Sequence, residues 1–533
     1  MIHPKLVEAM FRPEFYPNRP EHVEFIETHI SYIFVAGDYV YKVKRPVRFD
    51  FLDFSTLEKR RIFCNEELRL NRRLAPSVYL DVVEIAEDEK GNIVLGGGSR
   101  IIDYAVLMLR LPEDRMLQAL IQEGKTGPGV MDIVAKKLAD FHAHAATGEG
   151  IDEIGGVDTV RRNHDENFEE TEKYLNITIP DHQYTFIKYY AFDFMQRNHD
   201  LFVKRVADHR IRDCHGDLHL EHICIMDPGR RGLSSDDVIV FDCIEFNERF
   251  RYEDIASEVA FLAMDLDCRE HPDYAEAFVS SYIGHSLDCE IGDLLNFYKC
   301  YYAFVRGKVT SFRLEENDTG EAERRQEISE ASHYFDCAYT YAAIPEKPTL
   351  FLMAGLTGTG KSVRADSLAP RVAASVIRTD VVRKELLGIH LSERHPEAFG
   401  TGLYADDITR KTYGRALELA EEKLMGGTSV IIDATFGKRA DREKAVEFAE
   451  SLGVYVFLIE CVCPPDTVRN RLELRMKDDK GVSDGRWEIY LRQRETYDSI
   501  TEIPEGLHIV LDTTQTPEEC TYRALMKIKG FSP

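Results

Sequence analysis

GLTGTGKS, residues 355–362, is the stretch that decides the fold of the second half of this chain. A glycine, four further residues and Gly-Lys-Ser are the spacing of a loop that wraps its backbone N–H groups around phosphate oxygens, with a lysine on the outer phosphates and a hydroxyl on Mg²⁺. Residues 349–354 (TLFLMA) predict a buried strand before the loop, and the residues from Val363 predict a helix whose N-terminus faces the anion. We therefore expect a nucleotide site, with Ser362 as a metal ligand, formed by Gly355, Thr357, Gly358, Thr359, Gly360, Lys361 and Ser362.

Short apolar segments alternate with longer helical patterns through the rest of this half. The expected strands are residues 349–354, 375–380, 428–435, 454–461 and 508–513. Such alternation predicts a three-layer α/β domain with a parallel sheet, which we place at residues 345–533. Ligands of these sheets bind at the carboxyl ends of the strands, so Asp380 and Asp433 are expected to face the phosphates.

Asp380 and Arg383 are one helical turn apart, which puts a carboxylate and a guanidinium on one face. A kinase needs a base that accepts the proton of the acceptor hydroxyl and a cation that orients the acceptor, so this pair is a candidate for both roles. The alternative is a helix-capping aspartate with a surface arginine. Asp433 is a candidate Mg²⁺ ligand through water, because an acidic residue often ends this strand in phosphate-loop enzymes.

Three arginines recur at helical spacing further along the chain: Arg469, Arg471 and Arg475. Guanidinium groups stabilise the charge that develops on a transferred phosphoryl group, so Arg471 and Arg475 are candidates for a lid over the triphosphate. A solvated, charged helix is the alternative interpretation of this segment.

These features together resemble the small-molecule and polynucleotide kinases of the phosphate-loop class. The resemblance covers roughly residues 345–530 and extends to gluconate kinase-type, polynucleotide 5′-kinase-like and zeta-toxin-like proteins. It implies ATP-dependent, Mg²⁺-dependent phosphorylation of a hydroxyl group. It does not choose among a sugar, a nucleotide sugar and an RNA end as the acceptor.

A second group of motifs lies in the first half of the chain. DCHGDLHLEH (213–222) contains Asp217 on a predicted loop, and VIVFDCIEFN (238–247) presents Asp242 after a strand. Upstream, DYVYKVKRP (38–46) predicts a strand that carries Lys42, and the following helix offers Glu67 or Glu66 as its ion-pair partner. Lysine, glutamate, loop aspartate and metal-binding aspartate follow one another in this order in the protein-kinase-like active site.

This half resembles the aminoglycoside phosphotransferase family, whose catalytic loop has the pattern HGDLHxxN, from about Phe34 to Lys308. The resemblance implies a bilobal, protein-kinase-like α+β domain over residues 1–340, with a small lobe at about 20–110 and a large lobe at about 111–340. It also implies Asp217 as the catalytic base and Asp242 as an Mg²⁺ ligand. His222 stands where the family has a second metal ligand, asparagine, and imidazole nitrogen suits Mn²⁺ better than Mg²⁺.

Length and composition limit the classes of protein to which the chain can belong. With 533 residues the chain is too long for one core, and its net charge of −26 argues against a broad nucleic-acid surface while leaving a short RNA end open as an acceptor. The 11 cysteines are scattered, as is typical of a reducing compartment. Residues 1–17 contain prolines and charges in place of a signal peptide, and we expect a cytoplasmic protein without a membrane partner.

The combination of domains resembles bacterial proteins in which an aminoglycoside-phosphotransferase-like domain is fused to a phosphate-loop ATP-binding domain. Our leading hypothesis is an enzyme with two ATP sites that transfers the γ-phosphoryl group to a hydroxyl-bearing acceptor. In a second hypothesis the N-terminal domain is a nucleotide-binding pseudokinase that regulates the C-terminal kinase. A third hypothesis is an RNA-end or nucleotide-sugar kinase.

Overall fold

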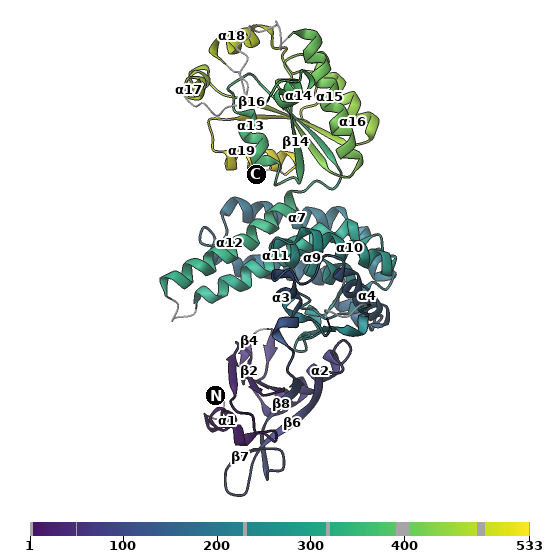
Figure 1. Cartoon of the computed structure of the whole chain (residues 1–533), viewed down its shortest axis with the longest axis vertical. Helices are drawn as coiled ribbons and strands as arrows, with labels where there is room; N and C mark the ends of the chain where they lie inside the picture. The colour runs from purple at the N-terminus through teal and green to yellow at the C-terminus, as the bar shows by residue number, and fades with distance from the viewer. Residues whose placement is uncertain are drawn as a thin grey trace. The chain divides into compact units, whose positions relative to one another are not determined.

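The computed structural model describes residues 4–49, 51–227, 232–315, 320–390, 405–476 and 486–531. The chain forms two compact units (Figure 1). The N-terminal unit contains Met1–Tyr174 and Ala191–Tyr334, and the C-terminal unit contains Leu175–Tyr190 and Phe335–Pro533. The second unit therefore includes a segment from the middle of the first half of the sequence.

The N-terminal unit begins with a six-stranded antiparallel sheet in the order β1-β2-β3-β8-β6-β7. Alternating apolar residues bury one face of this sheet against α1 and the other against α2. The helices here are α1 (Pro4–Met10) and α2 (Leu57–Asn71). The strands of the sheet are β1 (Glu24–Glu27), β2 (Ser31–Ala36), β3 (Tyr39–Lys44), β6 (Tyr79–Glu87), β7 (Ile93–Leu95) and β8 (Arg100–Leu109). Two short strands, β4 (Arg48–Phe49) and β5 (Leu52–Asp53), pair with each other separately.

A mainly helical region follows, built around the buried helix α9, which contacts α10 and α11. Two short antiparallel pairs, β9 with β12 and β10 with β11, lie beside it. The strands are β9 (Ile211–Asp213), β10 (Ile223–Ile225), β11 (Val238–Val240) and β12 (Tyr252–Asp254). The helices are α3 (Leu117–Gln122), α4 (Val130–His144), α5 (Ile151–Ile154), α6 (Val157–Thr171), α7 (Asp181–Arg197), α8 (His199–Ala207), α9 (Ile255–Cys268), α10 (Pro272–Ser286), α11 (Ile291–Phe312) and α12 (Glu321–Ala343).

The C-terminal unit contains a five-stranded sheet in the order β14-β15-β13-β16-β17, and every neighbouring pair is parallel. The prediction of a parallel α/β sheet in this half is therefore confirmed. The strands are β13 (Thr349–Ala354), β14 (Ala374–Arg378), β15 (Ser429–Asp433), β16 (Tyr455–Val462) and β17 (His508–Asp512). The helices are α13 (Lys361–Leu368), α14 (Thr379–Leu386), α15 (Asp406–Met425), α16 (Arg439–Leu452), α17 (Pro465–Met476), α18 (Trp487–Thr496) and α19 (Pro517–Ile528).

The two faces of this sheet are covered by different helices (Figure 1). Buried residues of α14, α15 and α16 pack on one face, while α13 and α19 contact each other on the opposite side. The central strand β13 has a neighbour of later sequence on each side, so the strand order reverses there. Such a switch point opens a crevice at the carboxyl ends of the strands, which is where ligands of these sheets bind.

The segment Leu175–Tyr190 belongs to the C-terminal unit because its aromatic side chains pack within that unit. The ring centroid of Phe186 lies 5.2 Å from that of Tyr339 and 5.5 Å from that of Phe531. Arg371 adds an ion pair of 2.7 Å with Asp336 in the last turns of α12. The unit thus extends beyond the sheet to the helical segments that precede it.

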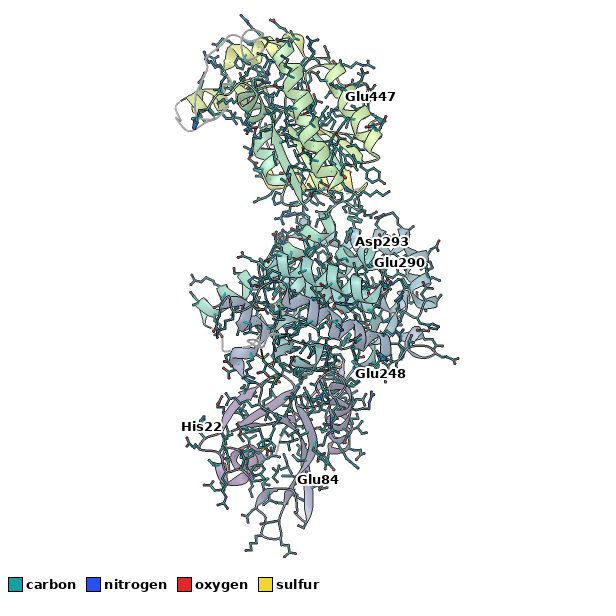
Figure 2. All side chains as sticks on the ribbon, turned by 45° about the vertical axis from the view of Figure 1, so that its right-hand side comes forward. His22, Glu84, Glu248, Glu290, Asp293 and Glu447 are labelled. Carbon is teal, nitrogen blue, oxygen red and sulfur yellow. The ribbon has the colours of Figure 1, made fainter. Side chains whose placement is uncertain are left out.

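Acidic side chains are exposed on the surface of both units. Glu84 and Glu248 of the N-terminal unit and Glu447 of the C-terminal unit are exposed (Figure 2). Within the described residues, none of the helices has the length and apolar character needed to span a lipid bilayer.

Candidate functional sites

The phosphate-binding loop lies between β13 and α13, as the sequence predicts. Gly355 has a φ of 130°, and a Cβ atom there would lie 2.5 Å from the carbonyl oxygen of Cys461, so glycine is required. Gly360 also has a positive φ, and α13 begins at the next residue. The free N–H groups at the start of α13 therefore face the space that the loop encloses.

Lys361 and Asp433 are the central charged residues of this site. The ammonium group of Lys361 donates a hydrogen bond to the carbonyl oxygen of Leu356 at 3.0 Å. Burial lowers the pKa of Lys361, although the nearby carboxylate of Asp433 opposes that shift. Burial also raises the pKa of Asp433, which accepts a hydrogen bond from Ser362 and ends β15. The hydroxyl of Ser362 and the carboxylate of Asp433 therefore form an oxygen-rich pair of the kind that Mg²⁺ prefers.

Asp380 and Arg383 form an ion pair of 2.9 Å on one face of α14. The expected strand 375–380 is shorter in the structure, because β14 ends at Arg378 and Asp380 lies in the first turn of the helix. The carboxylate of Asp380 is close enough to influence the pKa values of both Lys361 and Asp433. It is also 43% exposed, so an acceptor molecule can reach it.

The three arginines of α17 have different environments. Arg471 donates to the carbonyl oxygens of Thr359 and Thr513, at 3.3 and 2.6 Å, and so ties α17 to the phosphate loop. Arg475 is exposed, and its charge contributes to the lowered pKa of Lys361. Arg469 is also exposed and pairs with Glu473 of its own helix at 3.0 Å. Arg471 and Arg475 thus lie near the loop, whereas Arg469 fits the solvated-helix interpretation.

One loop contact was missed by the sequence reasoning. The backbone N–H of Thr357 donates to Oε1 of Gln493 on α18, at 2.8 Å. No local pattern marks Gln493, because it follows the loop by 136 residues in sequence and its contact depends on how α18 packs.

In the N-terminal unit, Lys42 of β3 connects two carboxylates. Its ammonium nitrogen lies 2.5 Å from Oδ1 of Asp242 and 2.9 Å from Oε1 of Glu67. Burial lowers the pKa of Lys42, but Asp242 and Glu67 outweigh that effect and raise it well above its usual value. Of the two expected partners, Glu67 is therefore the one that contacts the lysine, while Glu66 pairs with Arg69 at 2.6 Å.

Lys44 is a second buried lysine on the same face of β3, and the sequence reasoning gave it no role. It pairs with the other oxygen of Glu67 at 2.7 Å and also with Glu245, three residues after Asp242. Burial lowers the pKa of Lys44, yet Glu245 and Glu67 raise it further than burial lowers it. This ion pair holds the sheet against the segment that presents Asp242.

The loop that carries Asp217 is fixed through its backbone. Gly216 has a φ of 84°, and a Cβ atom there would lie 2.7 Å from the carbonyl oxygen of Phe250. Oε1 of the buried Glu258 accepts the N–H groups of His215 and Gly216, both at 2.7 Å, and Oε2 lies 2.6 Å from Nε2 of His142. Buried backbone groups satisfied in this way cannot move without losing several hydrogen bonds, so Asp217 is rigidly presented.

Two histidines flank Asp217. Its Oδ2 lies 3.6 Å from Nε2 of His219 and 3.6 Å from Nδ1 of His222. Burial raises the pKa of the Asp217 carboxyl, but His219 and then His222 outweigh it, so the pKa lies below its ordinary value. The carboxyl group is therefore ionised at neutral pH and can accept hydrogen bonds.

The tautomer of His222 follows from its contacts. Nδ1 lies 2.9 Å from the carbonyl oxygen of Asp217 and must donate to it, which leaves the lone pair on Nε2. That nitrogen lies 3.7 Å from Oδ2 of Asp242. A metal-binding histidine commonly donates its other ring N–H to a backbone carbonyl, so His222 and Asp242 form a candidate metal-binding pair. Asp217, His219 and His222 are also close together, but Nδ1 of His222 is already used by the carbonyl.

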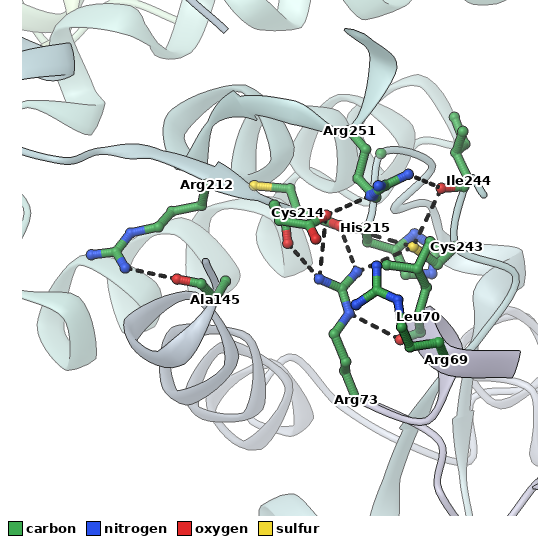
Figure 3. A network of polar contacts seen from close by, with 12 residues as sticks. Arg69, Leu70, Arg73, Ala145, Arg212, Cys214, His215, Cys243, Ile244 and Arg251 are labelled. Carbon is green, nitrogen blue, oxygen red and sulfur yellow. Dashed lines mark hydrogen bonds and ion pairs between the residues drawn. The ribbon is translucent and has the colours of Figure 1, made fainter. Parts of the chain in front are cut away.

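Asp242 is held in a backbone conformation that few non-glycine residues adopt. Its φ is 64°, and its N–H donates to the hydroxyl of Tyr79 at 3.1 Å. Arg73, just after the end of α2, donates to the carbonyl oxygens of Asp213 and Cys214, just before the Asp217 loop, and to the sulfur of Cys243 (Figure 3). One arginine thereby joins the two segments that carry the aspartates.

Comparison with known proteins gives one set of matches that is limited to the C-terminal unit. Residues 350–499 match the family described as AAA domain, a span that contains the phosphate loop, α14 and β15. A gluconokinase from Sinorhizobium meliloti has 19% identity and a TM-score of 0.26, covering 34% of this chain and 93% of that one. The APS kinase CysC of Mycobacterium tuberculosis has 17% identity and a TM-score of 0.27, covering 35% of this chain and 99% of that one.

Relatives across most of the chain then define its family. Uncharacterized proteins of Mycobacterium bovis and Mycobacterium tuberculosis are 30% identical to it over 454 residues, which is 85% of this chain and 86% of each relative. The chain belongs to the family of these mycobacterial proteins.

Proposed function

We propose that this protein is a kinase that uses ATP and Mg²⁺ to phosphorylate a hydroxyl-bearing acceptor at its C-terminal site. The observation that carries the proposal is the arrangement around the loop at residues 355–362. Lys361, Ser362 and Asp433 surround the expected phosphate position, and the exposed Asp380 lies beside them in an ion pair with Arg383. A base, an orienting cation and groups that neutralise phosphate are what phosphoryl transfer requires of a protein.

In this proposal each residue has one task. The loop amides and Lys361 hold the phosphates, and Ser362 and Asp433 hold Mg²⁺, which neutralises charge on the phosphate oxygens. Asp380 accepts the proton of the acceptor hydroxyl, and Arg383 keeps its carboxylate in place through their contact of 2.9 Å. Arg471 and Arg475 of α17 supply positive charge near the loop.

The test is the Asp380→Asn variant of the full chain. We expect phosphoryl transfer at the C-terminal site to fall about 10²- to 10⁴-fold, because the amide cannot accept the proton, while ATP affinity is nearly unchanged. The measurement is transfer from radiolabelled ATP to a library of hydroxyl-bearing metabolites, alongside calorimetric titration with ATP. Asp407→Asn, on the exposed surface of α15, is the matched control. Full transfer by Asp380→Asn with every acceptor would remove Asp380 from the mechanism.

We further propose a second phosphotransfer site in the N-terminal unit, of the aminoglycoside phosphotransferase type. Lys42 binds the phosphates of ATP, Glu67 holds Lys42, Asp217 is the base, and Asp242 and His222 bind the metal ion. The fixed tautomer of His222 and its distance of 3.7 Å from Asp242 support this assignment. The alternative is a nucleotide-binding regulator without transfer activity, and the nitrogen ligand at position 222 is what favours it.

His222→Asn separates these two roles. If the N-terminal site transfers phosphate, we expect wild type to be more active with Mn²⁺ than with Mg²⁺, and the variant to gain Mg²⁺-supported activity, because an amide oxygen suits the harder ion. Transfer is measured with each metal in an Asp380→Asn background, so that the C-terminal site does not contribute. Absence of transfer for either metal and either chain, together with nucleotide binding that persists when Lys361→Ala removes the C-terminal site, would identify the domain as a sensor.

A further inference from the structure

The contact between Gln493 and the phosphate loop is the observation from which this inference starts. Oε1 of Gln493 accepts the backbone N–H of Thr357 at 2.8 Å. A backbone N–H can only donate, so the oxygen end of the carboxamide must face Thr357. The amino end of Gln493, with two donors, is thereby left for another partner.

The helix that carries Gln493 is anchored at both ends. Tyr490 is buried in a cluster with Val468 and Leu472 of α17, and Leu356 of the loop packs against that cluster. At the other end, Lys438 donates to the carbonyl oxygen of Thr496 at 2.8 Å. The position of Gln493 is therefore set by packing and not by the hydrogen bond to Thr357 alone.

The place of Thr357 in the loop indicates which phosphate this carboxamide faces. The N–H groups at the start of α13 point to the inner phosphates, and Lys361 extends to the outer ones. Thr357 lies near the start of the loop, four residues before Lys361, and in the proposed site we place it on the side of the outermost phosphate. Donors aimed at that group act where charge develops during phosphoryl transfer.

We infer that Gln493 is a further residue of the triphosphate site, whose carboxamide is oriented by Thr357 and donates a hydrogen bond to the γ-phosphoryl group. The inference rests on the proposed kinase function of the C-terminal site. It assigns to α18 the recognition of a triphosphate as opposed to a diphosphate, because ADP lacks the group that Gln493 contacts.

The test compares ATP and ADP binding in Gln493→Glu and Gln493→Ala. Glutamate keeps the acceptor for the Thr357 N–H but replaces the donor with negative charge. We expect Gln493→Glu to weaken ATP binding about tenfold or more relative to ADP binding. We expect Gln493→Ala to weaken ATP binding a few-fold and to change ADP binding little. Binding is measured by calorimetry with Mg²⁺ in full chains that carry Lys42→Ala, which weakens the proposed N-terminal site. Glu495→Gln, an exposed change on the same helix, should leave both affinities unchanged.

Other outcomes overturn the inference in distinguishable ways. If both variants bind ATP and ADP more tightly than wild type and to the same extent, Gln493 competes with phosphate for the loop and does not bind the phosphate. If the Gln493 variants leave the ratio of ATP to ADP affinity unchanged while Lys361→Ala still abolishes ATP binding, the proposed role of Gln493 is wrong and the nucleotide site stands. If the Lys42→Ala chain binds no ATP at all, the proposed function of the C-terminal site fails with it.

Discussion

Replacing Lys361 with alanine should lower phosphoryl transfer at the C-terminal site by about 10³-fold or more, equivalent to about 4 kcal/mol in activation free energy. Lys361 is the partly buried cation of the loop, and its ammonium group donates to the carbonyl oxygen of Leu356 at 3.0 Å. Bound phosphate offers it a far stronger, charge-assisted partner. The measurement is the transfer rate from ATP in the full chain.

Lys423→Ala is the matched control for this prediction, because it removes an exposed lysine from α15, far along the sequence from the loop. Its rate should equal that of wild type. The thermal unfolding temperature of the Lys361→Ala chain should remain close to that of wild type, because this partly buried ammonium group has no ion pair to lose among the described residues. Normal turnover by Lys361→Ala in an Asp217→Asn background would contradict the assignment of the loop.

Replacing Asp217 with asparagine should abolish transfer at the N-terminal site, by about 10³-fold, and leave nucleotide binding there intact. Asparagine has the same shape but cannot take up the proton of an acceptor hydroxyl. The low pKa of Asp217, which His219 and His222 maintain against burial, makes it ionised at neutral pH. Transfer is measured in the Asp380→Asn background and binding by calorimetry.

Asp236→Asn supplies the control, because it changes an exposed carboxylate in the segment between β10 and β11 to which no role is assigned. Two results bear on the second site. Unchanged transfer by Asp217→Asn would show that another group acts as the base. Absence of transfer in the chain with an intact Asp217 would leave the N-terminal domain as a regulator.

Much of the structure of the C-terminal unit could be predicted, because the sequence patterns that indicate its strands, its helices and the phosphate loop are each short and continuous in the chain. The loop spacing fixes a strand before it and a helix after it, and β13 and α13 follow at residues 349–354 and 361–368. Asp433 ends β15 as its apolar run indicates. The contact of Gln493 with Thr357 was not predictable, because it depends on the packing of two helices that are distant from the loop in sequence.

In the N-terminal unit the sequence predicted a glutamate of α2 as the partner of Lys42, but its spacing could not distinguish Glu66 from Glu67, and the contact of Lys42 with Asp242 was not predicted. Only the rotation of α2 decides which of two adjacent carboxylates faces the sheet. The roles of Glu258 and Glu245 were also missed. Both are buried charges whose partners, His142 and Lys44, lie more than 100 residues away in sequence.

We propose that this chain has two separate phosphotransfer sites, and a comparison of four chains can show whether both exist. Transfer from radiolabelled ATP is compared among wild type, Asp217→Asn, Asp380→Asn and the double variant, with the same pool of hydroxyl-bearing acceptors. We predict that each single variant loses the labelling of a different acceptor and that the double variant labels none. Undiminished labelling by the double variant would contradict the account.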